Sequence, residues 1–169
     1  MKIGFLLISL TFIFKPGLIL KAGKMPGARQ IFDKSGYYHV MASGDLTAID
    51  SELVVLNRAS IREKEAYEGA LQMKKAGLLH RPKEKLAVFR SGATKLETAI
   101  AADSTNGEYH FLRLIIQEHA PAVVHYHNDK EKDSTFIYRV FKMLPPVVQK
   151  AIRDYCPHSK LLHAKDLHG

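Results

Sequence analysis

The stretch 99-AIAADSTNGEYHFLRL-114 decides the fold class of this chain. It contains the end of one amphipathic helix, a short polar turn and the start of a second amphipathic helix. Thr105 and Glu108 have the spacing of a capping box, in which the hydroxyl and the carboxylate each accept a hydrogen bond from a free amide at the helix start. Such a junction is typical of helical hairpins. The sequence therefore predicts an all-α protein.

Helix signals recur on both sides of this junction. Apolar side chains are spaced three and four residues apart, and capping or helix-ending residues (Asp45, Ser60–Glu63, Gly77, Pro82) stand at the boundaries. No segment between Asp45 and Tyr155 alternates as a strand would. We expect about six helices, over residues 45–56, 60–77, 82–102, 105–120, 128–144 and 147–155.

The pattern 99-AIxxDxxNxEY-109 resembles the boundary between adjacent tetratricopeptide repeats, with Ser104 in place of the usual proline. The resemblance covers residues 60–120. It implies a short array or bundle of helical hairpins in which the helices starting at Ser60 and Thr105 line a concave binding surface. The tract 108-EYHFLRL-114, followed by Gln117-Glu118, also resembles a block of small exported bacterial proteins, and that likeness implies no activity.

The amino terminus has the features of a secretory signal peptide. Lys2 precedes an uncharged apolar run over residues 3–14, which Lys15-Pro16 ends before it reaches the length of a membrane span. An uncleaved amino-terminal anchor is the alternative. The expected organisation is a signal peptide over 1–22, a linker or irregular segment over 23–44, a helical-hairpin domain over 45–156 and a polar tail over 157–169.

Export changes the interpretation of the net charge. The formal charge is +8, and removal of residues 1–22 with their three lysines leaves +5. An exported protein in the periplasm or cell envelope rarely meets nucleic acid, so we expect acidic partners: a protein, anionic lipid or polysaccharide. The basic residues are densest from Lys74 to Arg90, a stretch that is either a solvated helix end and loop or a face that binds anionic lipid or polysaccharide.

The candidate binding residues are polar side chains on the two helices that the resemblance places along the concave surface. Arg113 could form a bidentate contact with a carboxylate of a partner. In the alternative interpretation it pairs internally with Glu97, Glu108 or Glu118. The candidates are His110, Arg113 and Gln117 on the second helix and Lys64 and Glu68 on the first.

Catalytic and metal-binding signals are sparse. The best metal candidates are His125 and His127, within a region from His119 to Asp133 that also holds Asp129; surface histidines in a polar connection are the alternative. The chain has neither a glycine-flanked nucleophilic serine nor a glycine-rich phosphate loop, and Gly92 is expected to permit close approach of two helices. Cys156 is the only cysteine and is expected to be buried.

These observations favour a non-catalytic protein-interaction or scaffold module of the bacterial cell envelope, without a cofactor. A small metal-dependent or hydrolytic enzyme that uses the His119–Asp133 region is the rival interpretation.

Overall fold

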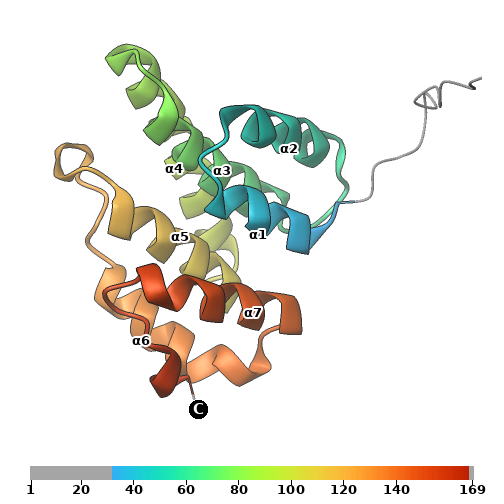
Figure 1. The fold of residues 1–169 in the computed structure, drawn as a ribbon, viewed down its shortest axis with the longest axis vertical. Helices are drawn as coiled ribbons and strands as arrows, with labels where there is room; N and C mark the ends of the chain where they lie inside the picture. The colour runs from blue at the N-terminus through green and yellow to red at the C-terminus, as the bar shows by residue number, and fades with distance from the viewer. Residues whose placement is uncertain (1–31, 168–169) are drawn as a thin grey trace, which may run out of the picture.

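Helix α5 (Gly107–His119) lies at the centre of the computed structural model, which describes residues 32–167 (Figure 1). Ten of its thirteen residues are buried. The predicted signal peptide lies outside the described residues, as do the first residues of the predicted linker. Between Phe32 and Leu167 the chain forms helices and turns and no strand. The all-α prediction is confirmed for this range.

Seven α-helices follow one another along the described chain, joined by short turns and 3-10 segments. Besides α5 they are α1 (Lys34–Ala42), α2 (Leu46–Arg58), α3 (Lys64–Leu78), α4 (Pro82–Ala102), α6 (Lys130–Val140) and α7 (Pro146–Tyr155). Four 3-10 turns complete the fold: Ala122–Val124, Phe141–Met143, Cys156–His158 and Ala164–Asp166. Within residues 32–167 no helix combines the length and the apolar character that a bilayer crossing requires.

Two hydrophobic cores share helix α5. The first is built by α1 to α5 and includes Tyr67, Leu96 and Leu112, all fully buried. The second joins α5 to α6, α7 and the carboxyl-terminal segment, and it includes Phe111 and Ile152. Because opposite sides of α5 enter different cores, this helix links the two halves of the structure. Cys156 is buried in the second core, as predicted.

The closest helix contact is between α3 and α4. A Cβ atom added to Gly92 would lie 2.5 Å from the carbonyl oxygen of Gly69, and one added to Gly69 would lie 2.6 Å from the carbonyl oxygen of Gly92. Both positions therefore need glycine because backbone meets backbone. The prediction that Gly92 permits close helix approach is confirmed.

The predicted helix starts are partly correct. Asp45 caps α2 and accepts a 2.8 Å hydrogen bond from the amide of Thr47. Helix α5 is capped by Asn106 rather than Thr105, because the Asn106 side chain accepts the Glu108 amide. The capping box at Ser60–Glu63 is wrong: α3 begins at Lys64, and its N-cap residue makes no side-chain capping bond. Gly77 does not end α3, which continues to Leu78.

Two segments predicted to be irregular are packed. Residues 34–42, assigned to the linker, form α1, which Asp33 caps through the amides of Ser35 and Gly36. Tyr37 anchors this helix in the first core, where its hydroxyl donates to the Tyr67 carbonyl oxygen at 3.1 Å. The tail after Cys156 buries Leu162 and Leu167 in the second core, so tertiary packing orders a segment whose sequence is largely polar.

Candidate functional site

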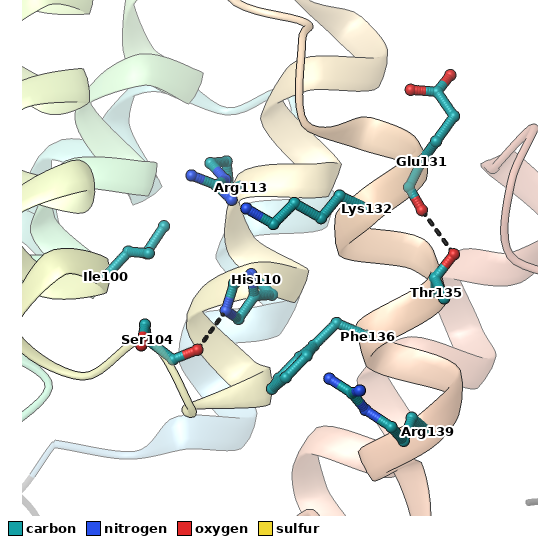
Figure 2. Close-up of a pocket in the computed structure, with 9 residues that line it drawn as sticks. All are labelled: Ile100, Ser104, His110, Arg113, Glu131, Lys132, Thr135, Phe136 and Arg139. Carbon is teal, nitrogen blue, oxygen red and sulfur yellow. Dashed lines mark hydrogen bonds between the residues drawn. The ribbon is translucent and has the colours of Figure 1, made fainter.

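An open groove of about 740 Å³ lies between the end of α4, the first turns of α5 and the outer side of α6 (Figure 2). We call it the α4–α6 groove. Its walls combine an apolar residue, an aromatic ring, hydroxyl groups and several charged side chains. They are Ile100, Ser104, His110, Arg113, Glu131, Lys132, Thr135, Phe136 and Arg139.

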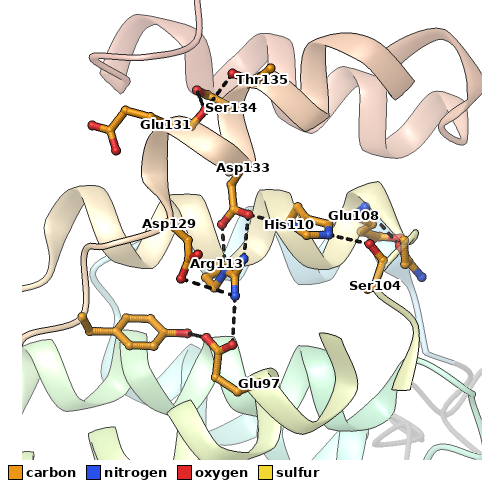
Figure 3. A network of polar contacts seen from close by, with 12 residues as sticks. Glu97, Ser104, Glu108, His110, Arg113, Asp129, Glu131, Asp133, Ser134 and Thr135 are labelled. Carbon is orange, nitrogen blue, oxygen red and sulfur yellow. Dashed lines mark hydrogen bonds and ion pairs between the residues drawn. The ribbon is translucent and has the colours of Figure 1, made fainter. Parts of the chain in front are cut away.

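The floor of the groove is a buried ion network between α5 and α6 (Figure 3). Asp133 is fully buried, and its carboxylate accepts two hydrogen bonds from Arg113, from Nε at 2.8 Å and from Nη2 at 2.7 Å. This is the bidentate geometry for which arginine is suited. His110 contacts the same carboxylate through Nδ1 at 2.7 Å.

Helix α4 and the loop after α5 complete the network. Nη1 of Arg113 donates to Glu97 of α4 at 2.9 Å and lies 3.7 Å from Asp129. The hydroxyl of Tyr126 donates to the second carboxylate oxygen of Glu97. One guanidinium group thereby connects α4, α5 and α6, and all of its nitrogens have carboxylate partners.

The electrostatics of the network follow from this pairing. Burial alone would raise the pKa of Asp133, but the hydrogen bonds from Arg113 and His110 and their charges outweigh it and hold the pKa below its ordinary value. Burial would lower the pKa of Arg113, and the contact with Asp133 instead raises it. Burial, together with the Glu97 carboxylate, raises the pKa of Tyr126. Arg113 and Asp133 are therefore a stable ion pair and not a proton-transfer couple at neutral pH.

His110 is held on both sides. Its Nδ1 faces the Asp133 carboxylate, and its Nε2 lies 2.9 Å from the backbone carbonyl oxygen of Ser104. Both neighbours are hydrogen-bond acceptors, so a protonated ring nitrogen can donate on either side. The ring also packs on Phe136, with centroids 4.5 Å apart. These contacts tie the α4–α5 turn to α6.

The rim of the groove differs from its floor. Lys132 and Arg139 of α6 are exposed, and neither forms an ion pair within residues 32–167. Arg139 stacks over the Phe136 ring at 4.8 Å from its centroid. Glu131 is the one carboxylate on the rim among the lining residues. The groove thus presents two cations that form no ion pair within the described residues, and an aromatic ring, above a floor in which Arg113 is paired with carboxylates.

The predicted stripe on α5 is buried, and this corrects its assignment as an accessible binding surface. His110, Arg113 and Gln117 are each 5 % exposed or less. Arg113 pairs internally, as the alternative interpretation predicted, and Glu97 is one of its partners. Its main partner is Asp133, which that interpretation did not include.

The two candidates on α3 are also engaged internally. Glu68 is buried and accepts a 2.8 Å hydrogen bond from Lys95 of α4. Lys64 donates to the backbone carbonyl oxygen of Asn57 and lies 3.7 Å from Glu68. These side chains join α3 to its neighbours.

The metal candidates are dispersed. Asp133 belongs to the ion network, and Nδ1 of His119 contacts the backbone carbonyl oxygen of Ile115. His125 is exposed in the loop after α5, and His127 is half-buried there. Within the described part of the chain, no three histidine, cysteine, aspartate or glutamate side chains are placed to share a metal ion.

The buried contacts of Glu108 were not predicted. Glu108 of α5 accepts hydrogen bonds from the hydroxyls of Tyr67 at 2.7 Å and Tyr38 at 2.8 Å, and from Nζ of Lys34 at 2.9 Å. It attaches α1 to α3 and α5. The sequence signals were its place as the fourth residue of the capping box and its selection as a possible partner of Arg113, which pairs with Asp133 and Glu97 instead.

Comparisons of the chain with protein-family models, with curated proteins and with solved structures found no match.

Proposed function

We propose that this chain is a non-catalytic protein-interaction or scaffold module of the bacterial cell envelope, and that its partner binds in the α4–α6 groove. The observation that carries the proposal is the contrast between floor and rim. Beneath the groove, Arg113 and Asp133 satisfy one another, so neither is available as an acid, a base or a nucleophile. At the rim, Lys132 and Arg139 are exposed without ion-pair partners in the described chain.

The partner is a protein segment rich in aspartate or glutamate. Two cations on one face of α6, at i and i+7, favour carboxylates that lie about two helical turns apart. Phe136, halfway between them, offers an apolar and aromatic contact. Exposed ion pairs are individually weak, so binding also depends on this central contact.

A tetratricopeptide-like arrangement is part of the proposal. It is supported by the close packing of α3 on α4 through Gly69 and Gly92, and by α5 following α4 after a short polar turn. In this arrangement α3 with α4 and α5 with α6 are successive hairpins. The groove then lies between the second helices α4 and α6, with His110 and Arg113 of α5 at its floor.

Site-specific photocrosslinking tests the proposed interaction. A photoreactive residue replaces Thr135, which is exposed on the groove wall, and a second chain carries it at exposed Lys150 on α7 as a control. We expect a discrete protein adduct from position 135 that position 150 does not give, and its loss in a chain with Lys132→Glu and Arg139→Glu. Equal adducts from both positions, or an adduct that survives charge reversal, would contradict the proposal.

Export is tested separately. The proposal expects the chain in the periplasmic or membrane fraction, and sequencing of its mature amino terminus distinguishes a cleaved signal peptide ending near Ala22 from a retained anchor. Recovery in the cytoplasmic fraction alone, with Met1 retained, would contradict it.

A further inference from the structure

The tip of the α3–α4 hairpin projects from the body of the domain, and the loop after α5 packs against its base (Figure 1). A second groove of about 420 Å³ lies between α4 and this loop, where Phe89 packs edge-on against Tyr126. The α4–α6 groove and this second groove share no lining residue.

Large apolar side chains are exposed on this face. Val123, in the 3-10 turn of the loop, is 80 % exposed, and Leu86 of α4 is 40 % exposed. The sequence pattern places Leu86 on the apolar side of its helix, but α4 extends beyond the neighbours that would cover it. His125, two residues after Val123, ends this 3-10 turn with φ of 50°, a left-handed conformation that is strained for a residue other than glycine. Val123 thus lies exposed in a turn of defined backbone geometry.

Cations flank Leu86 along α4, and one of them, Arg90, lines the second groove together with Val123. Lys83 and Arg90 lie three residues before and four residues after Leu86, so all three share one face of α4. Arg81 and Lys85 add two more positive charges, and none of the four cations forms an ion pair within residues 32–167. The single acid of this stretch is Glu84, two residues before Leu86 and on another side of the helix.

We infer that the hairpin-tip surface, formed by Lys83, Leu86, Arg90 and Val123, docks on the surface of an anionic lipid bilayer. Exposed apolar side chains with lysine and arginine beside them match such a surface, because the apolar groups enter the headgroup boundary while the cations meet lipid phosphates and carboxylates. A protein partner would need acidic groups around an apolar centre, and a polysaccharide would use the cations but leave Val123 in water. The exposed valine thus favours the bilayer.

An environment-sensitive fluorophore attached through Val123→Cys in the full chain tests this inference. Native Cys156 is 7 % exposed, and the parent chain under the same labelling conditions measures its reaction. Met143, which is 76 % exposed between α6 and α7, gives a matched label through Met143→Cys. We expect a blue shift at position 123, and none at 143, on vesicles that contain phosphatidylserine; vesicles of phosphatidylcholine alone should give little shift at either position.

Charge reversal supplies the second arm. The label at position 123 reports how strongly the chain partitions onto anionic vesicles. Lys83→Glu with Arg90→Glu should lower this partition coefficient by at least about 30-fold. Lys142→Glu with Lys160→Glu, at exposed positions away from the tip, makes the same change in net charge and should leave the shift nearly unchanged.

Three results would overturn the inference. One is the absence of a shift at position 123 on anionic vesicles, even if the chain binds them through another segment. The second is an equal loss of partitioning in the two charge-reversed chains. The third is protection of the label by an anionic polysaccharide without any response to vesicles. Because the two surfaces share no residue, failure here is distinguishable from failure of the groove proposal.

Discussion

Replacement of Asp133 by asparagine is expected to lower the free energy of unfolding by about 3–5 kcal/mol. The carboxylate is fully buried and accepts hydrogen bonds from Arg113 at 2.7 and 2.8 Å and from His110 at 2.7 Å. Asparagine keeps the shape but removes the charge, so the guanidinium remains buried with one strong partner fewer. Folded domains typically have a free energy of unfolding of about 5–15 kcal/mol, so we expect the variant to stay folded with a Tm lower by roughly 10–20 °C.

The matched control is Asp129→Asn. Its carboxylate is 3.7 Å from the same guanidinium, but the side chain is 40 % exposed, so we expect a loss below about 1 kcal/mol. Urea unfolding followed by circular dichroism at neutral pH measures both variants against the parent. Equal effects of the two substitutions, or an effect of Asp133→Asn within about 0.5 kcal/mol of zero, would refute the structural role of the Arg113–Asp133 pair.

The pH dependence of the same comparison gives an independent check. The pKa of Asp133 is lower in the folded chain than in the unfolded chain. The stabilisation by its charge is therefore fully present above the unfolded pKa of about 4 and is lost as the pH falls toward the folded pKa. Since asparagine resembles the protonated acid, the difference in stability between the parent and Asp133→Asn should stay constant above about pH 5 and narrow as the pH falls below about 4. A constant difference would show that the charge is not responsible.

Three further substitutions test other parts of the fold. Gly69→Ala places a methyl group 2.6 Å from the Gly92 carbonyl oxygen and forces α3 and α4 apart, so it should lower the free energy of unfolding by about 1–3 kcal/mol. Gly77→Ala is the control: no atom lies within 4 Å of the new carbon, so stability should be unchanged or slightly higher. Thermal melting measures both variants. Glu108→Gln should lower stability by about 2–4 kcal/mol and expose α1 to proteolysis first; uniform protection of α1 would contradict its attachment through this carboxylate. Leu162→Ala should lower stability by about 2–5 kcal/mol, and no change would mean that the carboxyl-terminal segment does not pack.

The sequence predicted those parts of the fold that depend on local periodicity. Phe89, Leu96 and Ile100 recur at helical spacing and are buried on α4. Helix α1 was missed because residues 34–42 contain glycine, serine and aromatics without a sustained period; its stability comes from Asp33 and from Tyr37 in the core. Such tertiary support leaves no repeating pattern in the segment itself.

The candidate site was less predictable. The stripe of His110, Arg113 and Gln117 was identified by its spacing, but spacing does not tell whether a polar stripe faces solvent or a neighbouring helix. Asp133 pairs with Arg113 across twenty residues and between two helices, so no local signal connects them. The free cations Lys132 and Arg139 were not singled out, because an exposed lysine or arginine on a helix is common.

The most direct test of the account is the affinity of the groove for the partner segment captured at position 135, measured by calorimetric titration. The central claim is that exposed rim cations bind this segment while the buried charges beneath hold the helices together. Lys132→Glu with Arg139→Glu should raise Kd by at least about tenfold and change stability by less than about 1 kcal/mol, and the parent Kd should rise with salt. A Kd that is unchanged by charge reversal and by salt would contradict the claim.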